Sequence, residues 1–297
     1  PFGVRRFSPE YLRRTREGLW DRSTAALDPL SLPDRERILD AGAGTGEFAR
    51  VLAAESQAAV VCLDADPDLL AVARRETGLD AIAGDATRPP FADDTFDLVA
   101  CQALLVNLPE PAAALEAFGD PSSGLVAAVE PDNADVGVDS TVDSEVTLER
   151  RVREAYIRGV ETDVAMGSRL KQLFRAAGLE SIRTRRHYHR KVVEPPYTRA
   201  SLSAAARKAS GAGVADHETE LRRVLTPPEY DTLRAEWRGM GRAVRDAGPG
   251  GRHRGGGGVP LVLGGRGGRG RGGRSPSRAR PPRGRSAPRR RLAARAR

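Results

Sequence analysis

The feature that most limits how this chain can fold is a glycine-rich turn between an apolar segment and an amphipathic one. It reads Ile-Leu-Asp-Ala-Gly-Ala-Gly-Thr-Gly-Glu-Phe at residues 38–48. An apolar run that ends in closely spaced glycines and continues into a helical pattern predicts a strand, a tight turn and a helix. The start of such a helix offers free backbone N–H groups and a partial positive charge to a ligand. A carboxylate and a phosphate can both use this arrangement, so the turn by itself leaves the ligand open.

Apolar strands alternate with helical stretches from residue 38 to about residue 130. Helices are expected around Phe48 and from Asp66-Pro67 onward. This alternation is typical of a parallel sheet covered by helices on both faces. We therefore expect an α/β fold with a Rossmann-like, doubly wound, mostly parallel sheet and helical cap segments. The strands are predicted at 38–41, 60–64, 81–83, 96–102 and 125–130.

The spacing of the turn and two later acids narrow the choice of ligand. A dinucleotide-binding fingerprint that starts at Gly42 requires its third glycine at position 47, but this chain has Glu47 there. Asp64 closes the second strand, where a carboxylate can accept hydrogen bonds from both ribose hydroxyls. Asp85 follows the third strand and can accept a hydrogen bond from an adenine amino group. All three segments reach the carboxyl edge of the sheet, where ligands of open α/β sheets bind.

These segments resemble the successive motifs of class I S-adenosylmethionine-dependent methyltransferases, especially the broad small-molecule group. The resemblance implies an enzyme that uses S-adenosylmethionine as methyl donor. It places the methionine end of the cofactor at Asp40 and the glycine turn, and the sulfonium above Cys101 and Gln102. The resembling segments are residues 38–52, 60–70, 84–101 and 123–133. The cofactor-binding residues that it implies are Asp40, Gly42, Ala43, Gly44, Gly46, Asp64, Ala65, Asp85, Ala86 and Cys101.

The sequence does not single out a catalytic residue. Methyl transfer from a sulfonium needs alignment and exclusion of water, and a base only where the acceptor must lose a proton. The segment after the fourth strand, Cys-Gln-Ala-Leu-Leu at residues 101–105, lacks the Asn/Asp-Pro-Pro-aromatic signature of enzymes that methylate DNA amines. We therefore expect a small-molecule acceptor.

Two polar clusters leave alternatives open. Asp132 and Asn133 follow the fifth strand and resemble the metal ligands of catechol-type O-methyltransferases, but a turn is the favoured interpretation, so no metal is predicted. His187 and His189 share one face of a strand expected at 182–193. They could serve as a base, a weak metal pair or substrate contacts, or could belong to a solvated edge strand.

The chain is expected to divide into four parts. Residues 1–36 are a helical leader, with one amphipathic helix at 8–27 that begins at Ser8 and Pro9. Residues 37–135 are the cofactor-binding core, residues 136–247 complete the domain with acceptor-side helices, and residues 248–297 are a disordered tail. Aromatic side chains in the leader and the third part are candidate acceptor contacts or core residues: Trp20, Tyr156 and Trp237.

The predicted tail consists mainly of glycine and arginine. Residues 250–297 hold 15 arginines and no acidic residue. The formal net charge of +8 for the whole chain therefore arises from this tail, and the remaining residues are net acidic. Such repeats can bind RNA while disordered, which makes an RNA-binding protein one alternative function. A second interpretation is a frameshift, because only Val259–Leu263 could serve as the expected last strand. A nucleic-acid partner is expected only through this tail.

The remaining features bound the class of protein. No apolar run approaches the roughly 18 residues of a membrane span, so no membrane partner is expected. Cys62 and Cys101 both lie in apolar strands, which favours free thiols in a cytoplasmic protein. The first residue is Pro1, which suggests a fragment that lacks its N-terminus. Another adenosyl-nucleotide enzyme, such as an aminopropyltransferase, is a further alternative, although no acidic groove for a polyamine is evident.

Overall fold

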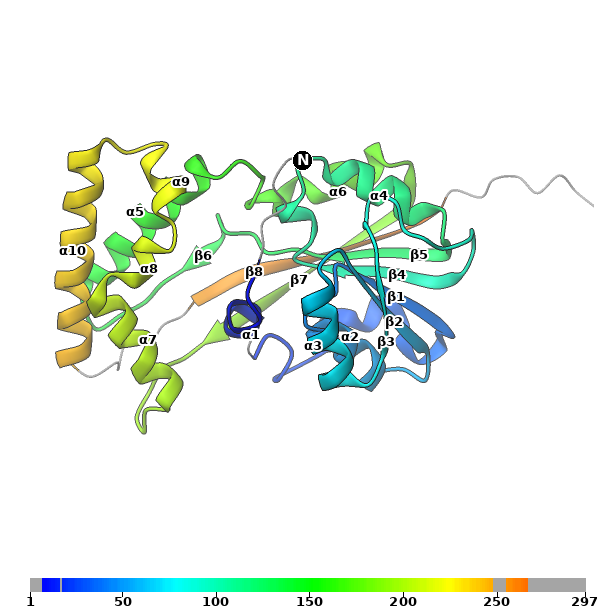
Figure 1. The fold of residues 1–297 in the computed structure, drawn as a ribbon, viewed down its shortest axis with the longest axis horizontal. Helices are drawn as coiled ribbons and strands as arrows, with labels where there is room; N and C mark the ends of the chain where they lie inside the picture. The colour runs from blue at the N-terminus through cyan, green and yellow to red at the C-terminus, as the bar shows by residue number, and fades with distance from the viewer. Residues whose placement is uncertain (1–6, 17, 248–254, 267–297) are drawn as a thin grey trace, which may run out of the picture. The chain divides into compact units, whose positions relative to one another are not determined.

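The computed structural model describes residues 7–16, 18–247 and 255–266. Its centre is a mostly parallel sheet with the strand order β3-β2-β1-β4-β5-β8-β6, and β7 also pairs with β8 (Figure 1). The first five strands are parallel and confirm the predicted positions. They are β1 (Arg37–Ala41), β2 (Ala59–Asp64), β3 (Asp80–Ala83), β4 (Phe96–Gln102) and β5 (Ser122–Val129).

The other three strands come from the second half of the chain. They are β6 (Val136–Gly137), β7 (Leu179–Lys191) and β8 (Gly255–Arg266). β8 runs antiparallel to β5, β6 and β7 and lies between β5 and β7. Leu261 and Leu263 are buried on one face of the sheet and Val262 on the other, as a strand covered on both sides requires.

β8 corrects the predicted boundary of the tail. The disordered part was predicted to begin at residue 248, yet residues 255–266 form a strand inside the sheet. Leu261, Val262 and Leu263 are its buried apolar residues among those whose burial is described. The sequence offered Val259–Leu263 as the candidate for a last strand, but the glycines around it obscured the full extent of the strand. The expectation of disorder for residues 267–297, and with it the RNA-binding and frameshift interpretations, falls outside the described residues.

Helices cover both faces of the sheet. α2 (Glu47–Ala54) and α3 (Pro67–Thr77) pack on the face that includes Ile38 and Cys62, while α4 (Pro111–Gly119) and α6 (Leu170–Ala176) pack on the opposite face. α3 begins as predicted, because the Asp66 carboxylate accepts the backbone N–H groups of Asp68 and Leu69. The predicted Rossmann-like fold is therefore confirmed.

The leader is shorter than predicted. α1 spans Pro9–Arg16 and begins with the Ser8 hydroxyl accepting the Tyr11 N–H. Gly18 adopts a φ of +75°, which ends the helical path, so the single helix predicted at 8–27 is wrong. Two short 3₁₀ turns follow, at Ala25–Leu30 and Leu32–Asp34, and Leu27 reaches the core from the first of them.

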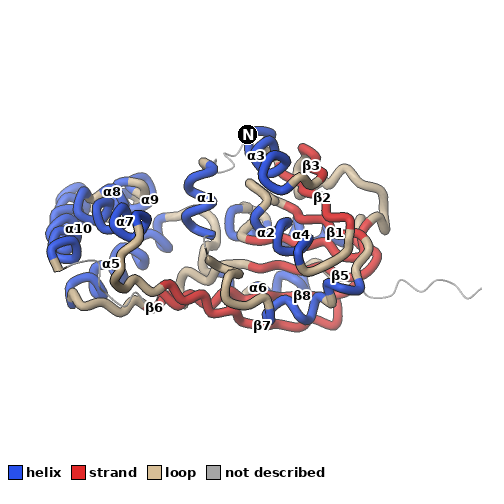
Figure 2. The backbone as a smooth tube through the Cα atoms, turned by 90° about the horizontal axis from the view of Figure 1, so that it is seen from below, coloured by secondary structure: helices blue, strands red, loops and turns tan. Residues whose placement is uncertain are grey.

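The remaining helices group together with a core of their own (Figure 2). Trp237, Tyr230 and Leu221 are buried there, so packing is the role of Trp237 rather than contact with an acceptor. None of the helices in the described ranges combines the length and apolarity that crossing a bilayer needs. The group comprises α5 (Asp143–Gly159), α7 (Arg199–Ser210), α8 (Ala212–Ala215), α9 (Glu218–Arg222) and α10 (Pro227–Asp246).

Candidate functional site

The glycine turn after β1 needs glycine for two physical reasons. Gly42, Gly44 and Gly46 have φ values of +72°, +57° and +83°, a region that strains any residue with a Cβ. A Cβ on Gly42 would lie 2.7 Å from the Leu104 side chain, and one on Gly44 would lie 3.0 Å from that of Leu12. The turn is therefore bent by conformation and closely covered by its neighbours.

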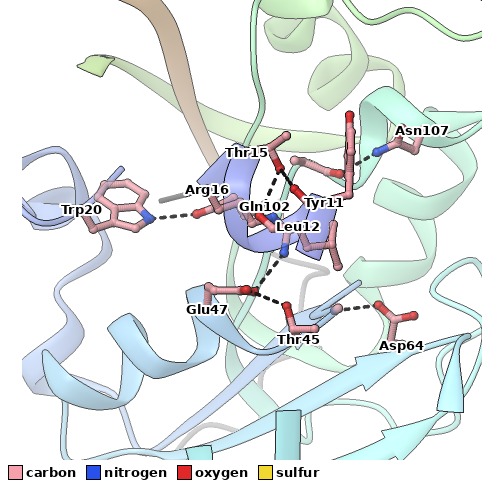
Figure 3. A network of polar contacts seen from close by, with 12 residues as sticks. Tyr11, Leu12, Thr15, Arg16, Trp20, Thr45, Glu47, Asp64, Gln102 and Asn107 are labelled. Atoms are coloured by element: carbon pink, nitrogen blue, oxygen red, sulfur yellow. Dashed lines mark hydrogen bonds and ion pairs between the residues drawn. The ribbon is translucent and has the colours of Figure 1, made fainter. Parts of the chain in front are cut away.

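Asp64, at the end of β2, holds this turn in place. One carboxylate oxygen accepts the Gly44 N–H at 2.7 Å, and the other accepts the Asp66 N–H at 2.9 Å (Figure 3). Each oxygen has a second lone pair, so the carboxylate can still accept hydrogen bonds from a ligand. Asp85 lies farther along the same edge, where one of its oxygens accepts the N–H and the hydroxyl of Thr87 at 2.8 Å each.

A cavity of about 470 Å³, here called cavity A, lies along this edge of the sheet. Six of the ten predicted cofactor residues line it: Gly42, Gly44, Asp64, Ala65, Asp85 and Ala86. These residues come from the ends of three neighbouring strands. The structure therefore brings together the segments that the sequence analysis placed in one crevice.

The other four predicted residues do not line this cavity. Ala43 is buried in the core, and Gly46 packs against Ala73 and Thr77 of α3. Cys101 is fully buried on the α4 face, with its sulfur 3.8 Å from a Glu130 oxygen, and does not line cavity A. Its place beneath the sulfonium stays a prediction.

Asp40 is the fourth of these residues and has unusual surroundings. It is fully buried, and neither carboxylate oxygen has a hydrogen-bond partner. Burial raises the pKa of Asp40 to about 7, and the positive charge of Arg16 opposes this rise. Asp40 therefore lies beneath the glycine turn as a buried acid that can attract a cation.

A second cavity, here called cavity B, has a volume of about 360 Å³ and a mostly apolar wall. It shares five residues with cavity A: Phe7, Leu12, Arg16, Ala103 and Asn107. The apolar residues that line cavity B but not cavity A are Tyr11, Leu19, Val106, Val129, Pro131, Val136, Tyr156 and Val164. Its polar lining also includes Thr15, Gln102, Asp132, Asn133 and His189.

The segment 103–107 forms the boundary between the two cavities. Ala103 has a φ of +50°, and the side-chain amide of Asn107 donates to its carbonyl oxygen at 2.8 Å. The buried Glu130 carboxylate accepts three successive N–H groups, those of Leu104, Leu105 and Val106. Burial raises the pKa of Glu130 to about 7 despite these bonds. The boundary is thus fixed by backbone contacts.

Sequence reasoning missed Glu130 and Asn107 as residues of the site. Glu130 was noted only as part of the end of β5, and Asn107 was not noted at all. A signal for Glu130 did exist, because an acid at the end of an apolar strand needs partners when it is buried. The sequence does not show which N–H groups supply them.

The two polar clusters now have defined contacts. Asp132 accepts the Ala134 N–H, which is a contact of a turn, and the Asn133 amide donates to the carbonyl oxygen of Val164, which ties this turn to a later segment. His187 lies 2.8 Å from the Leu19 carbonyl through Nε2, which must therefore carry the proton. His189 lines cavity B.

The comparisons with known proteins identify the central part of the chain. A family model described as a methyltransferase domain matches residues 39–118, which run from β1 to α4. Residues 39–118 are therefore similar to a methyltransferase domain. The resemblance to class I S-adenosylmethionine-dependent methyltransferases is confirmed by this match. Several residues that line cavity A lie within this matched stretch, among them Gly42, Asp64 and Asp85.

Curated relatives match about a third of the chain. A demethylmenaquinone methyltransferase of Beutenbergia cavernae is 42% identical over 98 residues, which are 33% of this chain and 40% of that protein. One of Renibacterium salmoninarum is 41% identical over 90 residues, 30% of this chain and 38% of that protein. This chain thus spans about two fifths of the length of these relatives. The methyltransferase-domain match at residues 39–118 leaves out most of the residues that line cavity B.

Solved structures with similar chains have low identity. Haemonchus contortus phosphoethanolamine N-methyltransferase 2, solved with phosphomonomethylethanolamine and S-adenosylhomocysteine, is 15% identical over 86% of this chain and 59% of that chain, with a TM-score of 0.45. The YcgJ protein of Bacillus subtilis is 15% identical over 82% of this chain and 98% of that chain, with a TM-score of 0.46.

Proposed function

We propose that this protein transfers a methyl group from S-adenosylmethionine to a small, largely apolar acceptor. The observation that carries this proposal is the meeting of two cavities at Ala103 and Asn107. Cavity A is lined by the carboxylates and the glycine turn of the methyltransferase domain. Cavity B is lined by apolar and aromatic side chains and opens beside it. A donor and an acceptor held in these cavities would meet at the shared wall.

The residues of cavity A fit the cofactor. Asp64 retains lone pairs that can accept the two ribose hydroxyls, and Asp85 lies where it can accept an adenine amino group. Gly42 and Gly44 line the cavity with backbone alone, so no side chain of their own lies between the turn and a ligand. The unpartnered oxygens of Asp40 supply negative charge beneath the turn, which suits the ammonium group of the methionine end.

The chemistry then asks little more of the protein than positioning. When bound, S-adenosylmethionine would supply an activated methyl group: the acceptor would bond to the methyl carbon in line as the carbon–sulfur bond breaks, and the neutral thioether S-adenosylhomocysteine would leave. The chain excludes water with the leader helix α1 and with the apolar wall of cavity B. Gln102 is held by the Trp20 N–H at 2.8 Å, and Asn107 is held by the Ala103 carbonyl. Both amides are therefore fixed before an acceptor arrives, which supports alignment.

A quinol is the acceptor that the relatives favour. The demethylmenaquinone methyltransferases are similar to about a third of this chain, and a quinol ring would suit an apolar cavity with a few polar groups. Because that similarity is partial, the choice of acceptor rests on the chemistry of cavity B.

Titration calorimetry with S-adenosylmethionine and S-adenosylhomocysteine tests the donor. We expect Asp64→Lys to abolish binding, because reversal of the charge removes both the ribose acceptor and the bond to the turn. Asp80→Lys is the matched control, because Asp80 is exposed at the opposite end of its strand and should bind normally. If the unchanged protein ignores both ligands at millimolar concentration, the proposal is wrong.

Transfer of a labelled methyl group tests the acceptor. We expect label in demethylmenaquinol, and not in a catechol or a primary amine offered under the same conditions. Val136→Trp places a large ring in cavity B without touching cavity A, so it should abolish transfer while S-adenosylhomocysteine still binds. Normal transfer by this variant would show that the acceptor binds elsewhere.

A further inference from the structure

Helix α1 lies across both cavities. Leu12 and Arg16 line cavity A and cavity B, whereas Tyr11 and Thr15 line cavity B alone. Figure 3 shows α1 above the glycine turn and Glu47, with Gln102 beside it. One short helix therefore forms part of the wall of both sites, although the match to the methyltransferase domain does not include it.

Arg16 is the cationic residue of α1 that lines both cavities. Its side chain is 11% exposed, and its guanidinium lies 3.3 Å from where a Cβ on Gly44 would be. Its ion pair with Glu47 is long, at 3.5 Å, and Glu47 already accepts the Thr45 hydroxyl at 2.6 Å. Arg16 thus has donor capacity left over above the turn, because a guanidinium carries five N–H groups.

The charges around Arg16 match an amino-acid group. Asp40 has two unpartnered carboxylate oxygens beneath the turn, and Glu47 begins the helix that follows it. A ligand with one ammonium and one carboxylate on the same carbon can place the ammonium toward these acids and the carboxylate toward Arg16. A guanidinium binds a carboxylate through two parallel hydrogen bonds, which fixes orientation as well as distance.

We propose that Arg16 binds the carboxylate of the donor's amino-acid group and that this contact seats α1, so that donor binding completes cavity B. The inference rests on the proposed function and adds a coupling between the two sites. Donor and acceptor then bind in order, the donor first. The carboxylate is the only negative group of the donor, so it is the only part that a cation would hold.

The other attachments of α1 are suited to such a role. At one end the chain is anchored by Trp20, whose ring stacks on His187 at 5.0 Å and whose N–H binds Gln102. Along the helix, the pair between Arg13 and Glu76 is exposed. Exposed pairs add little stability. A firm contact at Arg16 therefore changes how tightly the helix is held.

Calorimetry with two ligands tests the contact. S-adenosylhomocysteine carries the carboxylate, and 5′-(3-aminopropylthio)-5′-deoxyadenosine keeps the thioether and the amine but lacks it. We expect Arg16→Ala to weaken binding of S-adenosylhomocysteine about tenfold to a hundredfold and to leave the second ligand within about twofold. Arg14→Ala is the matched control, because Arg14 is exposed on the same helix and lines neither cavity.

Equal loss for both ligands, or no loss, overturns the contact at Arg16. Failure of the unchanged protein to bind either ligand would instead overturn the proposed function, so the two failures are distinct.

Hydrogen exchange tests the coupling. We expect amides of residues 9–20 to exchange more slowly in saturating S-adenosylhomocysteine, and this protection to be absent for the ligand without a carboxylate. Arg16→Ala should lose the protection while the amides of α2 keep theirs. If α1 exchanges at the same rate with and without S-adenosylhomocysteine, donor binding does not seat the helix.

Discussion

Asp40 is a single residue whose position lowers the stability of the folded protein. Its carboxylate is fully buried without a hydrogen-bond partner, which costs free energy when the group is charged. Buried titratable groups with a strongly shifted pKa cluster at sites that bind ligands or catalyse reactions. The position beneath the glycine turn makes the cofactor the natural partner.

This residue predicts a pH dependence of stability in the absence of ligand. The pKa of Asp40 rises from 3.8 to about 7 in the folded protein, so the folded state keeps a proton that the unfolded state has lost. Its contribution to the free energy of unfolding therefore falls as pH rises from about 4 to about 7. Asp40→Asn lacks this term, so its stability relative to the unchanged protein should grow by up to about 1.4 kcal/mol per pH unit there.

Urea unfolding of both proteins at several pH values between 4 and 8 measures this difference. Asp80→Asn, at an exposed acid, serves as the control and should follow the unchanged protein. A difference between Asp40→Asn and the unchanged protein that stays constant with pH would contradict the assignment.

Residues close together in sequence were the predictable part of the site. Gly42, Gly44 and Asp64 could be predicted because each follows a recognisable strand. Arg16 and Asn107 could not, because their roles depend on how α1 and the segment after β4 lie over the turn.

At the scale of elements, close helix packing depends on glycine at defined positions. α10 approaches the backbone of α7 at Gly241, where a Cβ would lie 2.3 Å from the Lys208 carbonyl carbon. Gly239 is on the same helix, and a Cβ there would meet only an Arg242 nitrogen at 4.0 Å. The two positions therefore separate the effect of contact from the effect of helix propensity.

Substitution of these two glycines by alanine gives opposite predictions. Gly241→Ala should destabilise the protein by about 1–3 kcal/mol, because the two helices must move apart. Gly239→Ala should be neutral or should stabilise by up to about 1 kcal/mol, because alanine favours the helix. Chemical unfolding measures both. Similar effects at the two positions would show that α7 and α10 do not pack this closely.

Helices and strands with a regular hydrophobic period and a recognisable first residue could be predicted from the sequence. Short segments without these signals could not. α3 begins at Pro67, as the predicted start at Asp66-Pro67 requires. α1 was overextended because Leu19, Trp20 and Leu27 fit a helical spacing that Gly18 interrupts. β8 was named only as a candidate strand at Val259–Leu263, because its apolar residues stand in a glycine-rich stretch. In such short segments, tertiary packing decides the structure.

At the scale of the whole molecule, the sheet depends on its last strand. β8 supplies Leu261, Val262 and Leu263 to the two faces and pairs with both β5 and β7. Burial of each such side chain contributes about 1.5–3 kcal/mol, and their sum is comparable to the total stability of a domain.

Truncation tests this dependence. A chain that ends at residue 267 should unfold cooperatively and bind S-adenosylhomocysteine. A chain that ends at residue 250 should lose the cooperative transition or aggregate, because two long strand edges are left unpaired. Circular dichroism on heating and size-exclusion chromatography distinguish the outcomes. A cooperative transition in the shorter chain would mean that β8 is dispensable.

The position of β8 also has a consequence for synthesis on the ribosome. β5 and β7 leave the exit tunnel early, but the strand that joins them is made only after α7 to α10 have been translated. At about 5–20 residues per second, both edges wait for seconds without their partner. A nascent chain of this protein is therefore a candidate client for chaperones that shield unpaired β-structure, until β8 emerges and inserts between β5 and β7.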